Sequence, residues 1–144
     1  MHILVLDDEK IRHEVFSIRY TKHEVDHAWG VTQCINLLQI RDKYDLISLD
    51  HDLGGHSQIG YAEPGELTGT DVANWIARNL PREKWPDRLI IHSWNIDGAI
   101  RMAKILNSVG ISTQREEFHP ISNEYELACQ KLYGTSSYSA ENEE

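Results

Sequence analysis

The chain has 144 residues, of which 40% are apolar and 26% are charged, a composition typical of one globular domain with a single core. Its 23 acidic and 14 basic residues give a formal net charge of −9, which repels nucleic-acid phosphates and argues against an extended nucleic-acid-binding face. No segment approaches the roughly 18 apolar residues that a membrane span requires, so we expect a protein without a membrane segment.

The first half of the chain alternates short apolar runs with helical periodicity, which predicts parallel strands covered by helices. Strands are predicted at residues 3–6, 25–29 and 46–49. The second is interrupted by Asp26 and His27, as is typical of an edge strand. Each of the first two strands is followed by apolar residues at helical spacing, so a helix covers each connection.

A long connection follows the third strand and ends at a helix that we expect to begin at Thr70, with Thr70 as its N-cap. This connection, from Gly54 to Gly69, exceeds the usual length of about 2–6 residues between a strand and a helix, which indicates a lid. Tyr61 within it, or Trp94 further along the chain, is a candidate for stacking on a nucleobase.

The second half of the chain completes the pattern with strands at residues 89–91 and 111–118, each followed by a helix. The helix after the fourth strand is expected to stop at Gly110. With no internal repeat and no linker, the sequence predicts one doubly wound, five-stranded parallel sheet in the order 2-1-3-4-5. This domain spans residues 1–134, and residues 135–144 form a polar, acidic tail.

The two cysteines, Cys34 and Cys129, lie in predicted helices and are not spaced as metal ligands or as a redox pair. They are therefore expected to be small core residues. Unpaired thiols are typical of a reducing compartment, so we expect a cytoplasmic protein.

Unusual polar residues follow the predicted strands, at the edge where ligands bind in such sheets. They are Asp7, Asp8 and Glu9 after the first strand, Asp50, His51 and Asp52 after the third, His92, Ser93 and Asn95 after the fourth, and His119 after the fifth. Carboxylates brought this close repel one another unless they share protons or bind a cation. Oxygen ligands suit Mg²⁺ or Mn²⁺, so Asp7, Asp8 and Asp50 are candidate metal ligands.

Each of these groups also has a structural interpretation. The acids after the first strand can cap a helix, and those after the third can form a turn. His92 also fits a hydrogen-bonded core histidine, and Asn95 fits the N-cap of the helix that follows it. The coincidence of carboxylates and histidines on one rim of the sheet favours a functional site.

The spacing of Asp7, Asp50 and Ser93 on five strand–helix units resembles the response-regulator receiver fold. The resemblance implies that the acids hold Mg²⁺ and that Asp50 accepts a phosphoryl group. Receivers carry a lysine before a proline after the fifth strand, whereas this chain has His119 before Pro120. This difference argues against ordinary regulated phosphotransfer.

A more specific resemblance, over about residues 1–120, is to the cyclic-phosphate-processing receiver-like domains found in bacteria and phages. The matching segments are LVLDDE at 4–9 with Arg12 and His13, LDHDLG at 49–54, TG at 68–69 with DVA at 71–73 and Trp75, and HSWN at 92–95 with GA at 98–99 and RM at 101–102. The resemblance implies a metal-assisted phosphoesterase that acts on cyclic phosphates, either 2′,3′-cyclic phosphate RNA ends or a cyclic nucleotide.

Opening a cyclic phosphate with water requires a base, an acid and positive charge on the phosphoryl oxygens. His51 and His92 are candidates for the acid and base, with His13 leaning over the same cleft. For binding the substrate phosphate, the candidates are Arg12, Ser93 and Asn95. The alternative is a non-enzymatic receiver-like module that binds a protein partner or accepts a phosphoryl group on Asp50.

Overall fold

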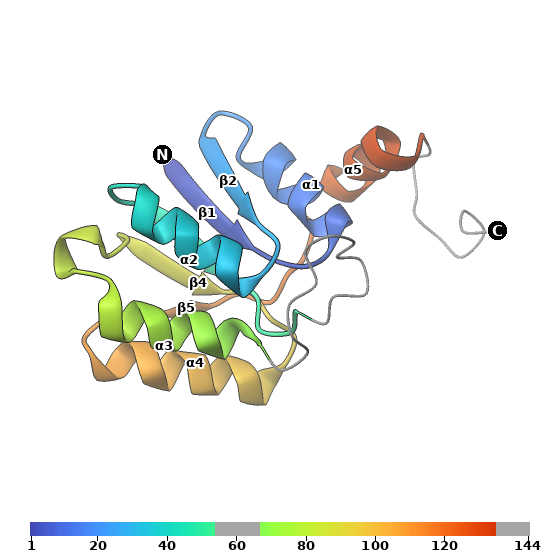
Figure 1. Ribbon diagram of the computed structural model, residues 1–144. Coiled ribbons are helices and arrows are strands. Elements are labelled where there is room, and N and C mark those ends of the chain that lie inside the picture. Colours follow the sequence, from blue (N-terminus) through green and yellow to red (C-terminus); the bar gives the residue numbers. More distant parts are fainter. Residues whose placement is uncertain (54–66, 135–144) are drawn as a thin grey trace.

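The computed structural model describes residues 1–53 and 67–134. Parallel strands form one five-stranded sheet in the order β2-β1-β3-β4-β5, with helices on both of its faces (Figure 1). In chain order the elements are β1 (His2–Leu6), α1 (Lys10–Arg19), β2 (Glu24–Ala28), α2 (Val31–Ile40), β3 (Leu46–Leu49), α3 (Gly69–Asn79), the 3₁₀ helix η1 (Arg82–Lys84), β4 (Arg88–Ile91), α4 (Ile96–Ser108), β5 (Gln114–Arg115) and α5 (Glu124–Tyr133). The predicted strand order and the edge position of β2 are confirmed.

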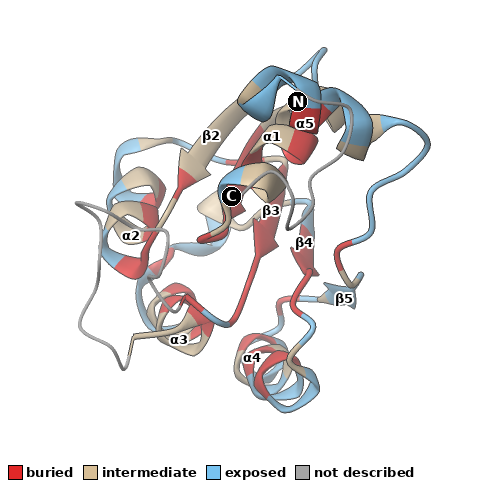
Figure 2. Ribbon diagram, turned by 90° about the vertical axis from the view of Figure 1, so that its right-hand side faces the viewer, coloured by how far each residue is buried: buried red, intermediate tan, exposed pale blue. Residues whose placement is uncertain are grey.

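The central strands are buried on both faces, which explains why they read as continuous apolar runs. In β1, Ile3 and Val5 belong to one apolar cluster with Val15 and Phe16 of α1, whereas Leu4 and Leu6 belong to the cluster on the opposite face, under α2, α3 and α4. Figure 2 shows this burial concentrated in β3 and β4 and on the inward sides of the helices, whereas β5 is exposed. Alternate residues of one strand therefore serve two helical layers.

The register of the central strands positions the site. Leu6 of β1 pairs with Leu49 of β3, and Leu49 pairs in turn with Ile91 of β4. These three apolar residues each end a strand at the same level, so the next residue of each chain segment emerges at the same edge. The carboxyl edge of the sheet thus brings together residues that are far apart in sequence.

The fifth strand is shorter than the predicted range of 111–118 and covers only Gln114–Arg115. The pairing nevertheless continues beyond it, because the backbone N–H groups of Glu116 and Phe118 donate to the carbonyls of Ile91 and His92. Phe118 thereby reaches the apolar cluster beside α1.

The N-cap of α3 is Thr68 rather than Thr70, so that prediction is wrong by two residues. The hydroxyl of Thr68 accepts from the N–H of Thr70 at 3.1 Å, and the Asp71 carboxylate accepts from the N–H of Thr68 at 2.8 Å. This reciprocal capping box starts the helix at Gly69. Gly69 has to lack a side chain, because a Cβ there would lie 2.1 Å from the carbonyl oxygen of Asp50.

Other expectations from the sequence have clear outcomes. Cys34 and Cys129 are free and buried, as predicted. The helix before Gly110 ends at Ser108, and Gly110 has a positive φ of 103°. None of the helices in residues 1–53 and 67–134 has the length and apolar character needed to cross a lipid bilayer. The expected lid, its Tyr61 and the acidic tail at 135–144 lie outside the described residues.

Candidate functional site

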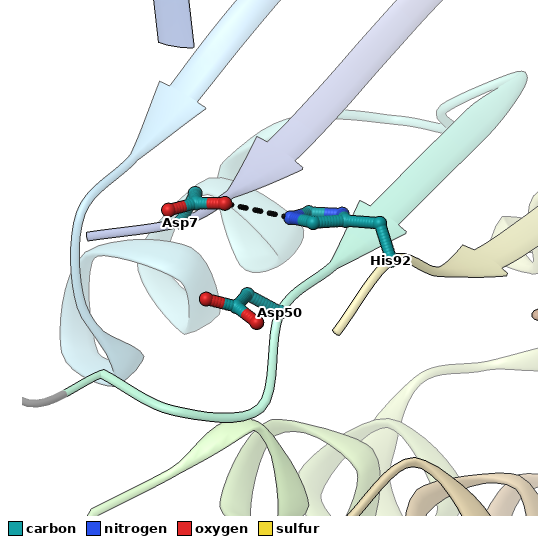
Figure 3. A group of neighbouring side chains, drawn as sticks. All are labelled: Asp7, Asp50 and His92. Carbon is teal, nitrogen blue, oxygen red and sulfur yellow. Dashed lines mark hydrogen bonds and ion pairs between the residues drawn. The ribbon is translucent and has the colours of Figure 1, made fainter. Parts of the chain in front are cut away.

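Three buried polar side chains meet at the carboxyl edge of the sheet. Asp7 follows β1, Asp50 follows β3 and His92 follows β4, so each comes directly after one of the registered strand ends. One ligand atom from each of the three lies within 4.8 Å of the others (Figure 3). We call Asp7, Asp50 and His92 the trio. Two carboxylates and an imidazole form a donor set that a divalent cation can bind.

His92 links the trio to the strand beneath it. Its Nε2 lies 2.8 Å from Oδ2 of Asp7, and its Nδ1 lies 2.7 Å from the hydroxyl of Ser48 in β3. With Asp7 ionised, Nε2 donates to the carboxylate and the Ser48 hydroxyl donates to Nδ1. Burial alone raises the pKa of Asp7, but the His92 hydrogen bond and the Arg12 charge outweigh it and lower that pKa.

The pKa of Asp50 is shifted in the opposite direction from that of Asp7. Burial, followed by the negative charge of Asp7, raises the pKa of Asp50 to about 8. The N–H of His51, which donates to Oδ1 of Asp50 at 2.9 Å, and the positive charge of Arg12 offset this only in part. Asp50 therefore carries a proton near neutral pH until a cation takes the proton's place.

Arg12 of α1 supplies positive charge at the rim of the trio. One guanidinium nitrogen lies 3.5 Å from Asp7 and 3.6 Å from Asp50, and the group sits 5.4 Å from the centre of the Phe118 ring. His119, at the position of the receiver lysine, instead contacts Trp94 ring to edge at 4.8 Å. The positively charged side chain beside the trio is therefore Arg12 of α1, and not a residue of the segment after β5.

A cavity of about 190 Å³ opens beside the trio. Its lining residues are Asp8, Glu9, Arg12, Asp50, Asp52, Ser93 and Trp94. Asp8 lies outside the trio, but its charge adds to those that raise the pKa of Asp50. The Ser93 hydroxyl accepts from the N–H of Asn95 at 3.0 Å, and Trp94 is half exposed. The cavity thus combines a carboxylate floor, one guanidinium and an aromatic wall.

Asn95 caps the helix behind the cavity. Its side-chain oxygen accepts from the N–H of Gly98 at 2.9 Å, which starts α4. Its side-chain nitrogen donates to Oδ1 of Asp52 at 3.0 Å. The alternative that Asn95 is an N-cap is therefore confirmed, and the same side chain also contacts a cavity residue.

His51 and His92 lie against opposite helical layers. The His92 ring packs 5.1 Å from Phe16 of α1, whereas the His51 ring lies against Gly98 of α4, where a Cβ would come within 2.5 Å of Cγ. The reason is the alternation of side chains along an extended chain: Asp50 is level with His92, so His51 is one step further and faces the other way. The structure therefore does not support an acid–base pair formed by these two rings.

His13 lies beneath the site with both ring nitrogens engaged. Nε2 donates to the carbonyl of Asp7 at 2.8 Å, and Nδ1 lies 2.6 Å from Nδ1 of His27. Burial lowers the pKa of His13 to about 4. A neutral ring without a free nitrogen supports the turn at Asp7, and the geometry gives no support for the predicted proton-transfer role.

Sequence reasoning missed the contributions of Ser48 and His27. A hydroxyl within the otherwise apolar run 46–49 was the available signal for Ser48. His27 follows Asp26 in an edge strand, and nothing in the sequence pairs it with His13. Asp52 was expected at this edge of the sheet, with a turn as the alternative, and it lines the cavity.

Solved structures share this fold. A receiver domain (CheY-like) from Methylobacillus flagellatus is similar with a TM-score of 0.59 and 18% identity, covering 85% of this chain and 88% of that one. The response regulator TrrA from Thermotoga maritima, in complex with Mg²⁺ and BeF, has a TM-score of 0.58 and 19% identity, covering 91% and 97%. No curated protein matches the sequence. At this level of identity the likeness shows the receiver fold.

A family model gives the more specific assignment. It is described as the cyclic-phosphate processing receiver domain and matches residues 2–108. The matched range contains the whole trio, together with Arg12 and the residues that line the cavity. Given this match over most of the sequence and the receiver topology of the sheet, the chain belongs to the family of cyclic-phosphate processing receiver domains.

Proposed function

We propose that the protein is a metal-assisted phosphoesterase that opens cyclic phosphates, either a 2′,3′-cyclic phosphate at an RNA end or a cyclic nucleotide. The observation that carries the proposal is the trio, in which buried Asp50 keeps a proton next to ionised Asp7. A divalent cation would replace this proton and stabilise the ionised form of Asp50. The family description supports cyclic phosphate as the class of substrate.

The donor set fits a hard or borderline divalent cation. Asp7 and Asp50 provide carboxylate oxygens, with Asp8 in the adjoining cavity, while Nε2 of His92 keeps its hydrogen bond to Asp7. Oxygen ligands suit Mg²⁺ or Mn²⁺. When bound, the cation supplies positive charge for the phosphoryl oxygens and lowers the pKa of a water molecule.

The residues around the cavity bind and orient the phosphate. Arg12 offers its guanidinium to two phosphoryl oxygens, and the Ser93 hydroxyl lies on the same wall. Asn95 contributes indirectly, through Asp52. A small cavity lined by the guanidinium of Arg12 suits a short substrate or a strand end. A long nucleic acid would be repelled by the net charge of −9.

The chemical step needs one proton taken and one given. The oxygen of water bonds to phosphorus, the bond from phosphorus to one ring oxygen breaks, and that oxygen receives a proton. The water gives up its proton to the solvent. Nε2 of His92, which carries a hydrogen when Asp7 is ionised, is the candidate for protonating the leaving oxygen, because it lies within the trio. His92 is kept in register with Asp7 by Ser48 from below.

The test is a panel of 2′,3′-cyclic and 3′,5′-cyclic nucleotides and short RNA with a cyclic phosphate end, each with Mg²⁺, Mn²⁺ or chelator. We expect metal-dependent opening of at least one member, and a loss of about 100-fold or more in His92→Gln. Asp87→Asn, an exposed acid paired with Lys43, is the matched control. A purified wild-type protein that opens no member of the panel with either metal would refute the proposal.

A second candidate function is supported by the receiver fold and by the place of Asp50 at the end of β3. In this reading Asp50 accepts a phosphoryl group and the domain signals to a protein partner. Incubation with a small phosphodonor followed by mass spectrometry distinguishes the two. A phosphoryl adduct on Asp50 without turnover of cyclic phosphates favours the signalling role.

A further inference from the structure

We infer that Asp52 is the substrate-contacting member of a His51–Asp52 pair, and that buried His51 and Asn95 are positioning residues that act through it. The inference deepens the proposed function and rests on it. It adds a carboxylate to the site and moves His51 out of direct contact with the reacting groups.

The two side chains differ in access to the cavity. Asp52 lines the cavity together with Asp50 and Arg12, and its side chain is 66% exposed. His51 lies behind it, with 8% of its side chain exposed. A substrate phosphate that contacts Arg12 therefore meets the carboxylate of Asp52 before it can reach the His51 ring.

His51 and Asn95 both contact the same carboxylate oxygen of Asp52, Oδ1. Nδ1 of His51 lies 2.7 Å from Oδ1, and the side-chain nitrogen of Asn95 lies 3.0 Å from the same atom. Within residues 1–53 and 67–134, no residue donates to Oδ2 of Asp52. Two donors on Oδ1 fix the orientation of the carboxylate and leave Oδ2 as an acceptor.

His51 is itself held in place from two sides. Gly98 provides room for the ring, because any Cβ there would lie 2.5–2.7 Å from ring atoms. The His51 carbonyl accepts from the N–H of Gly69 at 2.8 Å. The ring therefore packs directly against the backbone of α4 at Gly98.

The unsatisfied nitrogen of His51 supports this assignment. To donate to an ionised carboxylate, Nδ1 has to carry the hydrogen, which leaves Nε2 as an acceptor. Nε2 is buried and has no hydrogen-bond partner in the part of the chain that the structure describes. A buried unsatisfied group needs an explanation, and the donated Nδ1–H that orients Asp52 provides one.

The chemistry that follows is orientation. Oδ2 of Asp52 accepts a hydrogen bond from the attacking water or from a substrate hydroxyl next to the phosphorus. A water molecule held in this way keeps a lone pair directed at phosphorus. The pair thus adds a hydrogen-bond acceptor on the α4 side of the site, opposite His92 and Asp7 on the α1 side.

The first test is the tautomer of His51, measured by ¹⁵N NMR on the labelled wild-type protein without substrate. We expect the Nδ1–H form, and its loss in Asp52→Ala but not in the control Asp87→Ala. A wild-type His51 with its hydrogen on Nε2 would overturn the inference, whatever the activity of the protein.

The second test uses cyclic phosphate turnover. We expect Asp52→Asn to lower kcat about 100-fold with little change in KM or in Mn²⁺ affinity. His51→Asn, whose amide nitrogen replaces Nδ1, should keep more activity than His51→Leu. Adding His51→Leu to Asp52→Asn should lower kcat no further, because His51 acts only through Asp52.

The outcomes separate the two proposals. If the wild type opens no cyclic phosphate, the proposed function fails. If it does, and His51→Leu lowers kcat as much in the Asp52→Asn background as in the wild type, His51 touches the substrate itself and the inference fails.

Discussion

Two carboxylates of this domain, Asp26 in β2 and Asp50 directly after β3, are both largely shielded from solvent, but their pKa values are shifted in opposite directions. Oδ2 of Asp26, in the edge strand β2, accepts from the Tyr44 hydroxyl at 2.7 Å and from Arg41 at 3.0 Å, with His2 also at 3.0 Å. Burial raises the pKa of Asp26, but these partners outweigh it and lower that pKa.

Asp50 lies beside Asp7 and Asp8. Its partners among residues 1–53 and 67–134 are the N–H of His51 and an Arg12 guanidinium nitrogen at 3.6 Å, and its pKa is raised to about 8. The comparison shows that donors, and not burial alone, decide what a carboxylate does. Asp26 is part of the framework because its partners are already in place, whereas Asp50 is completed by a ligand.

The largest effect is expected for Asp50→Asn, which should lower activity and raise stability. Turnover should fall about 1,000-fold or more, equivalent to about 4 kcal/mol. The metal-free protein should become more stable by about 1–2 kcal/mol, because the folded state no longer has to keep a buried carboxyl protonated that would be ionised in the unfolded chain. Kinetics and thermal unfolding in chelator measure both. A less stable Asp50→Asn protein would contradict the electrostatic description of the site.

Asp26→Asn is the matched change at the other carboxylate. We expect it to destabilise the fold by about 2–4 kcal/mol, because Arg41 and Tyr44 lose an ionised acceptor. Metal binding and turnover of the folded protein should stay at wild-type values. Urea unfolding and calorimetric titration with Mn²⁺ provide the measurements. A loss of metal affinity without unfolding would contradict the assignment of Asp26 to the framework.

Metal affinity should depend on pH through Asp50. Because its pKa is raised to about 8, the cation has to displace a proton below that pH. The affinity for Mn²⁺ should therefore rise about tenfold per pH unit between pH 6 and 8 and level off above pH 8. In Asp50→Asn this dependence should disappear together with most of the affinity. A wild-type affinity that is constant over this range would exclude a proton on Asp50.

The smallest effect concerns stability in acid. Burial lowers the pKa of His13 to about 4, below the value of about 6.5 of an unfolded histidine. As the pH falls from 6.5 towards 4, the unfolded chain takes up the proton first, so the folded state loses stability. We expect a loss of about 1–2 kcal/mol over this window. His13→Gln should flatten the slope, and an equal slope in both proteins would assign it to other groups.

The sequence predicts the position of the trio because register and strand length determine it. Leu6, Leu49 and Ile91 end their strands at one level, so the polar residue after each is placed by period and pairing alone. The side of the sheet that each residue faces is harder to predict. His51 was grouped with His92 because both follow strands, but one step along an extended chain reverses the direction of the side chain.

Contacts between neighbouring elements were also beyond the sequence. The pairing of His13 with His27 joins a helix to an edge strand, and neither residue belongs to a recognisable pattern. The N-cap of α3 was placed at Thr70 because Asp71 directly after it suits the first turn of a helix. The close approach of Gly69 to Asp50, which favours Thr68, is a tertiary contact. Local patterns therefore predicted the elements, and packing set their ends.

The capping box of α3 has a consequence for how this domain can be re-engineered. Thr68 and Asp71 start the helix with their own side chains, and the His51–Gly69 hydrogen bond anchors the chain at the far side. The described residues on either side of 54–66 are thus held by bonds of their own. Doubling the length of such a stretch adds only about 0.6 kcal/mol of closure entropy. Grafting of foreign sequence at this point should therefore leave the scaffold intact, which makes it the natural place for new specificities to evolve.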